Sequence, residues 1–519
     1  MRRARTLMVQ GTSSHAGKSL LVTGLCRVFK QDGLRVMPFK SQNMSNNSAV
    51  THEGGEIGRA QWVQAEACGV APSVMMNPVL IKPKADSRSQ VVLMGRPYAD
   101  FAAREYGPQF AMHRALPEIQ KCLDELSAKC DLIMLEGAGS PAEINLREHE
   151  IVNMRIAEMA DAPVILVGDI DRGGVFAQFV GTLELLTPEE RARVKGFIIN
   201  KFRGDKSLLQ PGIEFLERRT NLPVLGVMPY IHAHQIPEED AVSVEQRQHE
   251  VPDWHEPGRI RVAVVRLPRI SNFTDFDRLR DEPGLDLYYA QTPRDLGYAD
   301  MIILPGTKNS VADLTWLKQT GLAEEIRSLR GVVPILGICG GFQMLGKCIH
   351  DPEALEGEAG THEALGLLDV ETSFGRAKTT TLSYGEVVTP TELFPQGVTV
   401  RGYEIHAGVT TRFGRARAFI KVHLRDGTHV PGGLDDECDG AVNISGDVVG
   451  TYFHGLLDND EMFAAFIESL FSRKALTPVL NRATRGPGGL AARCVAYDRL
   501  AQSVREHLDM AEIRRIAGI

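Results

Sequence analysis

A glycine-rich segment near the start of the chain has the composition of a phosphate-binding loop. It follows the apolar run Thr6–Val9 and precedes a helical stretch. Glycines let consecutive backbone N–H groups turn toward phosphate oxygens, and the helix N-terminus adds its dipole. A lysine in this pattern reaches the outer phosphates, and the serine hydroxyl after it binds Mg²⁺. The segment predicts a site for ATP and Mg²⁺ whose ATP-binding residues are Gly11, Thr12, His15, Ala16, Gly17, Lys18 and Ser19.

Acidic residues follow two other apolar runs of the first half. Glu136 comes directly after Asp131–Leu135 and is a candidate ligand of Mg²⁺ or of its water. Asp169 and Asp171 follow a later run, where they are either neighbours of the same site or helix caps. In an open parallel sheet, ligands bind beyond the carboxyl ends of the strands. We therefore expect Glu136 to lie beside the phosphate-binding loop, with Ser19 as the second Mg²⁺ ligand.

Cys339 indicates a second kind of chemistry, because it lies between an apolar run and a helical stretch in LGICGGFQMLG. Such an elbow exposes a nucleophile, directs the next backbone N–H at a developing oxyanion, and lowers the thiol pKa. A thiol nucleophile also needs a base, usually a histidine distant in sequence. Among 15 histidines, His454 in YFHGLLDN is the best candidate and His406 the second. Gly306 and Gly340 are the candidate oxyanion donors.

Both sets of residues need parallel strands to bring them together. The first half alternates short β-branched or apolar runs with helical stretches, and a second series starts at Ile260–Val265. Segments around Gly402–Thr411, Ala418–Leu424 and Val448–Phe453 read as strands of the same second domain. We predict two α/β domains at residues 1–230 and 259–475, joined by a linker at 231–258 and followed by a C-terminal extension at 476–519.

Composition excludes several classes of protein. With 519 residues the chain has room for at least two domains, and its formal net charge of −8 argues against nucleic-acid or polybasic membrane binding. No apolar run approaches the length of a membrane span. The eight cysteines lack the paired spacing of a disulfide framework or a zinc site. We expect a cytoplasmic protein with no nucleic-acid or membrane partner, and its oligomeric state stays open.

The phosphate-binding loop resembles the deviant loops of dethiobiotin synthetase and its relatives, because five residues rather than four separate Gly11 from Gly17. Those enzymes make an acyl phosphate or mixed anhydride from a carboxylate and ATP. The resemblance implies that Lys40, at the end of the second strand, contacts substrate and phosphate. It also implies a parallel-sheet fold, and the Asn-Lys pair at Asn200 resembles an adenine-reading pair of related nucleotide folds.

The segments around Cys339 and His454 resemble the class I glutamine amidotransferase domain. That resemblance implies hydrolysis of glutamine through a thioester, with release of ammonia. The family has a glutamate two residues after the histidine, whereas this chain has Leu456. Either the cysteine and histidine act as a dyad, or another group such as Glu404 orients the ring. Combined, the two halves predict ATP-dependent amidation, with the domains docked so that ammonia stays away from water.

Segments along nearly the whole chain together resemble the cobyric acid synthases of cobalamin biosynthesis. The resemblance implies amidation of the b, d, e and g carboxylates of adenosylcobyrinic acid a,c-diamide, giving adenosylcobyric acid. The expected partners are a corrinoid polycarboxylate, glutamine and ATP. Cobalt belongs to the substrate, so no permanently bound protein cofactor is expected. The segments are PFKSQNMSNNS, GGEIGRAQWVQAEA, NPVLIKPK, EGAGSPAEINL, GDIDRGGVFA, GYEIHAG and YFHGLLDN.

A large polyanionic substrate needs cationic and amide donors. The candidates are Lys40, Gln42, Asn43, Asn46, Asn47, Arg59, Lys82 and Lys84, with Trp62 for apolar surface. The nearest alternative is cobyrinic acid a,c-diamide synthase, which shares the two-domain plan but for which PFKSQNMSNNS is less typical. A partition-type ATPase would explain the first half only. An inactive scaffold is disfavoured by the intact Lys18 and Cys339.

Overall fold

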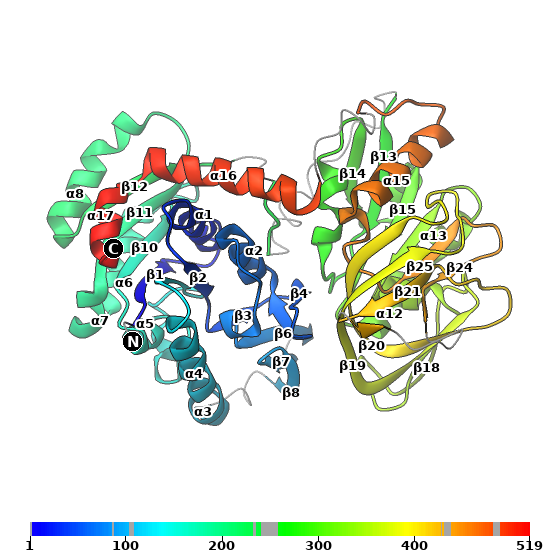
Figure 1. Ribbon diagram of the computed structural model, residues 1–519, viewed down its shortest axis with the longest axis horizontal. Coiled ribbons are helices and arrows are strands. Elements are labelled where there is room, and N and C mark those ends of the chain that lie inside the picture. Colours follow the sequence, from blue (N-terminus) through cyan, green and yellow to red (C-terminus); the bar gives the residue numbers. More distant parts are fainter. Residues whose placement is uncertain are drawn as a thin grey trace.

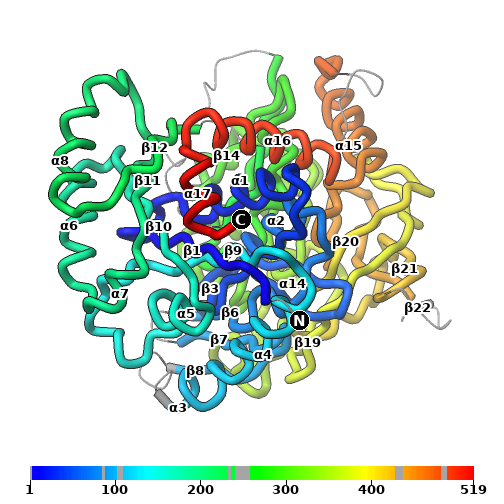
Figure 2. The backbone as a smooth tube through the Cα atoms, turned by 60° about the vertical axis from the view of Figure 1, so that its left-hand side comes forward, coloured from blue at the N-terminus to red at the C-terminus, as the bar shows by residue number. Residues whose placement is uncertain are grey.

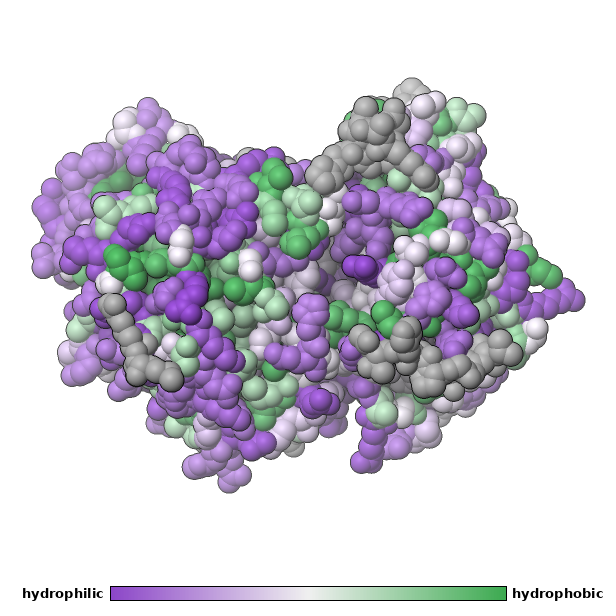
Figure 3. All heavy atoms as spheres, in the orientation of Figure 1, coloured by the Kyte–Doolittle hydropathy of each residue, from purple (hydrophilic) through white to green (hydrophobic). Residues whose placement is uncertain are grey.

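The computed structural model shows two α/β lobes docked against each other (Figure 1). In the space-filling view the lobes form separate bulges with indentations between them, and hydrophilic residues dominate the visible face (Figure 3). Most of the predicted linker, residues 240–257, and the glycine-rich run at 481–487 lie outside the described residues. The structure describes residues 3–85, 88–102, 108–231, 235–239, 258–426, 428–429, 437–480 and 488–519.

The first lobe contains a six-stranded sheet in the order β12-β11-β10-β1-β9-β2, and its neighbouring strands are parallel. Alternate residues of β1 point to opposite faces, and both faces are covered by helices, as expected for a parallel sheet. The apolar runs of the sequence correspond to these strands. The strands are β1 (Arg5–Gly11), β2 (Val36–Phe39), β9 (Leu132–Glu136), β10 (Val164–Asp169), β11 (Val194–Phe202) and β12 (Val224–Pro229).

Two hydrophobic cores lie on the two faces of this sheet. Met8 of β1 packs into the core that includes residues of α4, α5, α6 and α8. Leu7 and Val9 point the other way, into a core shared with α1, α2, α16 and α17. The first-lobe helices are α1 (Lys18–Gln31), α2 (Arg59–Cys68), α3 (Pro108–Phe110), α4 (Leu116–Ser127), α5 (Met154–Met159), α6 (Val175–Leu185), α7 (Pro188–Arg193) and α8 (Gln210–Thr220).

Two small sheets extend the first lobe beyond the end of β2. One has the order β3-β6-β7-β8, and the other pairs β4 with β5. They lie on the side of the lobe that faces the second lobe (Figure 1). Their strands are β3 (Gln42–Met44), β4 (Ser48–Val50), β5 (Glu56–Gly58), β6 (Val79–Ala85), β7 (Arg88–Leu93) and β8 (Arg96–Ala102).

The second lobe has its own sheet in the order β14-β13-β15-β16-β25-β24, parallel except for β24. The predicted α/β fold is therefore confirmed in both lobes. The sheet strands are β13 (Ile260–Val265), β14 (Leu285–Ala290), β15 (Met301–Leu304), β16 (Ile335–Ile338), β24 (Ala441–Val442) and β25 (Val448–Thr451). The helices are η6 (Phe273–Phe276), α10 (Asp277–Arg280), α11 (Pro293–Leu296), α12 (Ser310–Gln319), α13 (Leu322–Ser328), α14 (Gly340–Leu345) and α15 (Asp460–Arg473).

The second lobe also contains a mainly antiparallel sheet, which the sequence analysis did not distinguish from the parallel one. The segments around 402–411 and 418–424 belong to this sheet, and only β25 joins the parallel one. Its longest pair, β19 (Val370–Val387) and β20 (Thr399–Arg412), approaches the first lobe and contacts β4. The remaining strands are β17 (Cys348–Asp351), β18 (Gly360–Glu363), β21 (Ile420–Arg425), β22 (Thr428–His429) and β23 (Cys438–Asp439).

The chain ends on the lobe in which it begins. After the second lobe, α16 (Gly489–His507) crosses back over the first lobe and α17 (Met510–Ala517) follows it, so both termini lie there (Figures 1 and 2). Tyr497 of α16 is fully buried among residues of α1 and α2. Within the predicted C-terminal extension, α16 and α17 thus pack on the first lobe.

Buried polar contacts join the lobes. Glu56 of β5 accepts hydrogen bonds from Lys82 of its own lobe and, at 2.5 Å, from Lys378 of β19. Lys308 donates across the interface to Gln90 at 3.0 Å. The side chain of Glu56 is fully buried, and burial alone would raise its pKa, but the two lysines outweigh this and lower it. The ionised Glu56 therefore ties the first lobe to the second.

Among the described residues, no helix combines the length and apolar character needed to cross a lipid bilayer.

Candidate active sites

The predicted phosphate-binding loop connects the end of β1 to the start of α1. Lys18 is folded over the loop and donates hydrogen bonds to Ser13 O at 3.0 Å and Gly139 O at 3.1 Å. A Cβ atom on Gly11 would lie 2.8 Å from Lys18 Nζ. Gly17 has a φ of +89° at the N-cap of α1, a conformation that favours glycine. Gly11 is therefore required because Lys18 packs closely against the loop, and Gly17 because of its positive φ and its contact with Asn200.

Glu136 lies beside this loop, at the carboxyl end of β9. Its Oε1 accepts from Ser19 Oγ at 2.8 Å and from Lys40 Nζ at 2.9 Å. The carboxyl group is buried, which by itself raises its pKa, but the charge of Lys40 and the hydrogen bonds to the carboxylate outweigh this and lower it. Three of the predicted residues, which come from separate segments, therefore meet around one ionised carboxylate.

Sequence reasoning missed Gln64 at this cluster. Gln64 Nε2 of α2 donates to Glu136 Oε2 at 2.5 Å, and Gln64 Oε1 has no hydrogen-bond partner among the described residues. The side chain is fully buried. The signal was a glutamine on the buried face of a helix that also carries Arg59, Gln61 and Glu66, so it could equally have been an ordinary core amide.

The oxygen atoms of this cluster suit Mg²⁺. That ion is usually held by one or two carboxylates, phosphate oxygens and waters rather than by a dedicated cage of side chains. Ser19 and Glu136 offer a hydroxyl and a carboxylate next to the lysine that would hold phosphate. In the described part of the chain, no cluster of three or more His, Cys, Asp or Glu side chains forms a separate metal site.

Asn200 and Lys201 at the end of β11 hold the phosphate-binding loop from its other side. Asn200 Nδ2 donates to Ala16 O at 2.8 Å, and Lys201 Nζ donates to His15 O at 2.7 Å. Lys201 also pairs with Asp169 at 2.9 Å. The amide nitrogen of Asn200 is thus used within the protein, and contact with adenine stays a prediction.

The predicted substrate residues belong to the segment that runs from Lys40, after β2, toward the second lobe. Lys40 lies 3.8 Å from Glu239 as well as next to Glu136. The amide nitrogen of Asn43 donates to Gln61 at 3.0 Å and also to Glu239, so it is already occupied. Gln42 is half-buried on β3. Asn46 Oδ1 is buried and has no hydrogen-bond partner within the described residues, so it is open to a ligand.

Three further substrate candidates have partners within the protein. Lys82 pairs with the buried Glu56, and Lys84 pairs with Asp100 at 2.6 Å. Arg59 is buried and donates to Ser48 O at 3.1 Å and to the hydroxyl of Tyr403 in the second lobe. Both Arg59 and Lys82 are used in buried contacts at the interface between the lobes, and a contact of either with the substrate stays a prediction.

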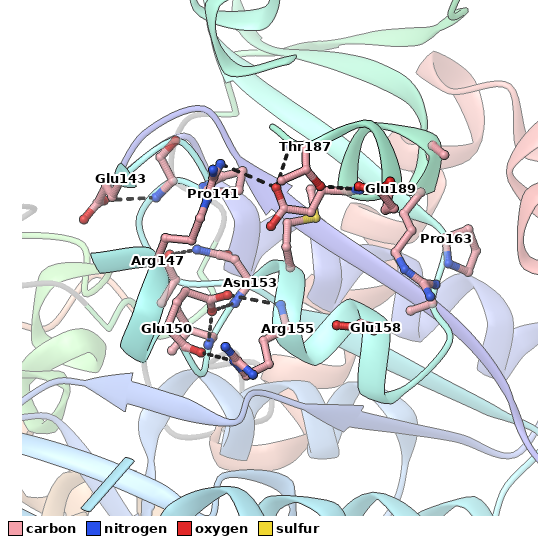
Figure 4. A pocket seen from close by; sticks show the side chains of 18 of the residues that line it. Pro141, Glu143, Arg147, Glu150, Asn153, Arg155, Glu158, Pro163, Thr187 and Glu189 are labelled. Atoms are coloured by element: carbon pink, nitrogen blue, oxygen red, sulfur yellow. Dashed lines mark hydrogen bonds and ion pairs between the residues drawn. The ribbon is translucent and has the colours of Figure 1, made fainter. Parts of the chain in front are cut away.

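The nucleotide-binding lobe also contains a polar cavity of about 670 Å³, which begins at Ala138 and Ser140 after β9 (Figure 4). Its side chains largely pair with protein groups. Arg147 donates to Leu185 O at 2.5 Å, and Asn153 donates to Ala138 O at 2.7 Å. The cavity therefore shares the segment after Glu136 with the phosphate site, but Lys40, Gln42, Asn43 and Asn46 do not line it.

In the second lobe, Cys339 forms the predicted elbow between β16 and α14. Its backbone has φ +53° and ψ −110°, a strained conformation for a residue with a side chain, and strain of this kind is concentrated at functional sites. A Cβ atom on Gly341 would lie 2.0 Å from Leu304 O, so only glycine allows α14 to approach β15 so closely. Cys339 Sγ is buried 3.4 Å from Ile405 O.

His454 lies next to Cys339, and Asp275 of η6 completes the constellation. His454 Nδ1 donates to Asp275 Oδ2 at 2.7 Å, while Asp275 Oδ1 accepts from the backbone N–H of Gly455 at 3.0 Å. Burial alone would lower the pKa of His454, but Asp275 and the hydrogen-bonded Cys339 outweigh it and raise the pKa to about 10. The raised pKa favours an imidazolium held by the carboxylate of Asp275 next to the Cys339 sulfur.

The orienting residue was not recognised from the sequence. Glu404, the expected candidate, instead contacts Ser383 at 2.5 Å and Arg425 at 3.3 Å. His406 lies 3.6 Å from the same glutamate rather than in the triad. Asp275 precedes His454 by 179 residues in SNFTDFDRLR, and no local pattern distinguishes it from a capping aspartate. His454 is therefore oriented by a carboxylate, but by one that lies far before it in the sequence and not two residues after it.

The two predicted oxyanion donors lie at the same site. A Cβ atom on Gly306 would be 3.2 Å from His454 Cε1, and one on Gly340 would be 3.1 Å from the backbone nitrogen of Thr307. Within the described residues, neither the Gly306 nor the Gly340 amide donates a hydrogen bond to another protein group. Two available N–H groups beside a buried thiol suit a developing oxyanion.

Comparisons with known proteins agree with this arrangement. Residues 7–243 match the model of the CobQ/CobB/MinD/ParA nucleotide binding domain, and residues 261–462 match the CobB/CobQ-like glutamine amidotransferase domain. A solved structure described as a glutamine amidotransferase is 19% identical, with a TM-score of 0.30 over 40% of this chain and 97% of that chain.

Full-length relatives are much closer. The cobyric acid synthase of Desulforamulus reducens is 49% identical over 523 residues, which cover 100% of this chain and 99% of the relative. The cobyric acid synthase of Sorangium cellulosum is also 49% identical, over 99% of both chains. With a nucleotide-binding lobe followed by a glutamine amidotransferase lobe, this chain belongs to the cobyric acid synthase family.

Proposed function

We propose that this chain converts the b, d, e and g carboxylates of adenosylcobyrinic acid a,c-diamide into amides, giving adenosylcobyric acid. Membership of the family makes it an ATP-dependent, glutamine-using amidotransferase of cobalamin biosynthesis. The observation that carries the proposal is the presence of two separate constellations in docked lobes. One surrounds Glu136 with phosphate-binding groups, and the other places a thiol, an imidazole and a carboxylate together.

In the first lobe, a substrate carboxylate oxygen attacks the γ-phosphorus of ATP, and the bond to the β-phosphate oxygen breaks. The products are an acyl phosphate and ADP. Lys18 and the backbone of the loop bind the phosphates, while Lys40 stabilises charge between nucleotide and substrate. Mg²⁺, when held by Ser19 and Glu136, would neutralise phosphate charge. We place substrate contacts at Lys40, Gln42, Asn43 and Asn46, with Glu239 moving away from Asn43.

In the second lobe, the Cys339 thiolate attacks the side-chain carbonyl carbon of glutamine. The Gly306 and Gly340 amides stabilise the oxyanion, and His454 gives its proton to the departing nitrogen, which leaves as ammonia. Water then hydrolyses the thioester to release glutamate, with His454 as the base. Ammonia reaches the first lobe, attacks the acyl carbon and displaces phosphate, so that each turnover yields one amide.

We place the reaction in the cytoplasm, because it consumes ATP and glutamine and requires a reduced thiol. All eight cysteines of the chain are free. A reducing compartment keeps such thiols available.

Mass spectrometry of the corrinoid product tests the proposal. The purified protein would be incubated with ATP, Mg²⁺, glutamine and either adenosylcobyrinic acid a,c-diamide or cobyrinic acid. Each acid-to-amide conversion lowers the mass by about one dalton, so the total shift counts the amidations. Four amidations of the a,c-diamide are expected. Selective reaction with cobyrinic acid would instead support the a,c-diamide synthase, and ATP hydrolysis without any amide would support a partition-type ATPase.

A further inference from the structure

A buried arginine of the nucleotide-binding lobe reaches the second lobe just behind the histidine. Arg59 is the first residue of α2, and its guanidinium donates to the Tyr403 hydroxyl. The same group lies 5.5 Å from the centre of the Tyr403 ring. We propose that Arg59 is a positioning residue for the glutaminase centre, acting through Tyr403 on His454. This inference rests on the proposed glutamine hydrolysis at Cys339.

Tyr403 is the surface against which the imidazole lies. The two ring centres are 5.1 Å apart, with an angle of 16° between the planes. Their backbones are also paired, with Tyr403 N donating to His454 O at 3.2 Å and His454 N donating to Tyr403 O at 2.9 Å. Asp275 fixes the edge of the imidazole while Tyr403 fixes its face. A shift of Tyr403 would therefore turn the ring away from Cys339.

Arg59 is well placed to prevent that shift. Its side chain is held between the rings of Tyr403 and Trp62, the latter 5.2 Å away, and it also donates to Ser48 O at 3.1 Å. Its positive charge faces Asp275, the carboxylate that orients His454. Burial raises the pKa of the Tyr403 phenol, so the hydroxyl stays protonated beside the guanidinium. These contacts link the first lobe to both supports of the imidazole.

The segment that carries Asp275 is held by the same lobe. Ser48 N donates to Asn272 Oδ1 at 3.0 Å, and Phe273 N donates to Asn47 Oδ1 at 3.3 Å. Asn272 is the N-cap of η6, which contains Asp275. The first lobe thus contacts η6 at its start and Tyr403 through Arg59. Docking of the lobes therefore completes the geometry of a centre whose reacting groups all belong to the second lobe.

Steady-state kinetics of the full-length protein test this inference. The Arg59→Gln and Tyr403→Phe variants would be assayed for glutamine hydrolysis in the presence of ATP and the corrinoid acid, and for amidation driven by ammonium chloride. Loss of alignment can cost up to about 100-fold in rate. We expect kcat for glutamine to fall by about 10- to 100-fold with KM little changed. Amidation from ammonium should stay near wild type, and the double variant should be no slower than the slower single one.

Arg493→Gln is the matched control. Arg493 is half-buried, lies 5.1 Å from Trp62 and pairs with Glu66 at 2.8 Å, so it shares part of the surroundings of Arg59. It reaches the second lobe through a longer ion pair with Asp458, at 3.9 Å, and not through Tyr403. It should retain the wild-type rate of glutamine hydrolysis. Arg59→Lys keeps a donor and a charge, so it should recover part of the lost rate.

Four outcomes would overturn the inference. Unchanged kcat in Arg59→Gln would show that the arginine does not align the imidazole. Equal losses with glutamine and ammonium would show a general structural effect, as would an equal loss in Arg493→Gln. If the wild-type protein itself hydrolyses no glutamine, the proposed function falls together with this inference. If the wild type is active and only the variant effects are missing, the proposed function stands.

Discussion

Cys339 has a strained backbone, a buried side chain and the imidazole of His454 next to its sulfur, while the groups that would bind ATP lie in the other lobe. Replacing this cysteine by alanine removes the nucleophile without touching the phosphate site. We expect Cys339→Ala to lower glutamine-driven amidation by about 1,000-fold or more, and to leave ammonium-driven amidation intact. Amide formation measured by mass spectrometry with either nitrogen source checks this. Loss of both activities would contradict separable sites.

Asp275 allows a second test, because its charge sustains the raised pKa of His454. Asp275→Asn keeps the shape but removes the negative charge, so the pKa of His454 falls from about 10. The imidazolium is then lost at lower pH, and the alkaline limb of kcat/KM for glutamine moves toward acidic pH. The rate at neutral pH should fall by about 100-fold or more, because the ring is no longer oriented.

The matched control for this prediction is Asp277→Asn, two residues further along. Asp277 lies on α10 and pairs with Arg280 at 3.2 Å. Its removal should leave the alkaline limb in place. An unshifted limb in Asp275→Asn, measured by glutamate release across pH, would show that Asp275 does not set the charge of His454.

The contrast between Cys339 and Asp275 shows what can be predicted from sequence at this scale. Cys339, Lys18 and Ser19 can be recognised in the sequence because the glycines next to them form the strand-to-helix turns that hold these residues. Asp275 and Gln64 act through side chains that meet distant partners, and their neighbours in sequence resemble ordinary caps or core amides. Glu404 illustrates the same limit, since it was offered as the group that orients the His454 ring, whereas it pairs with Ser383 and Arg425.

At the scale of elements, the phosphate-binding loop depends on a glycine at the N-cap of α1. In Gly17→Ala, a Cβ would lie 2.2 Å from Asn200 Nδ2, at a φ of +89°. The left-handed conformation alone costs about 1–2 kcal/mol, and the clash would displace the loop from β11. We expect ATP binding, measured by calorimetry, to be lost in this variant.

Gly33 offers a matched control, because it has a φ of +87° and a Cβ atom added there would meet no described atom within 4 Å. Gly33→Ala should therefore lose a similar amount of stability from its backbone while retaining ATP binding. Equal ATP affinity in the two variants would contradict a specific requirement at Gly17.

Strands were predicted more reliably than their sheets. The apolar runs of the first lobe correspond to strands because a parallel sheet buries both faces of each strand. In the second lobe, β20 and β21 were recognised as extended, but their membership of a separate sheet was not. The strand pairs that define it join residues far apart in sequence, such as Lys378 with Ala407. Local composition indicates an extended conformation without indicating the partner.

At the scale of the whole molecule, the chain crosses from one lobe to the other and back. A C-terminal extension was expected, but its packing on the first lobe was not, because the sequence of α16 has no local feature that indicates α1 or β12 as its neighbour. The contact is intimate, since Asp509 N donates to Leu225 O at 2.7 Å and a Cβ on Gly24 would lie 2.7 Å from Val504. The first domain can therefore complete one face of its sheet only after the second has been synthesised.

Tyr497 tests this dependence. Its ring is fully buried, and its hydroxyl donates to Glu66 Oε2 at 2.9 Å. Tyr497→Ala leaves a cavity in the core between α16 and the sheet, which should cost about 3–5 kcal/mol of unfolding free energy. Tyr497→Phe loses only the hydroxyl contact, at about 1 kcal/mol. Loss of ATP binding on heating reports the unfolding of the first lobe, and its midpoint temperature should be much lower for Tyr497→Ala than for Tyr497→Phe. Equal midpoints would contradict a structural requirement for α16.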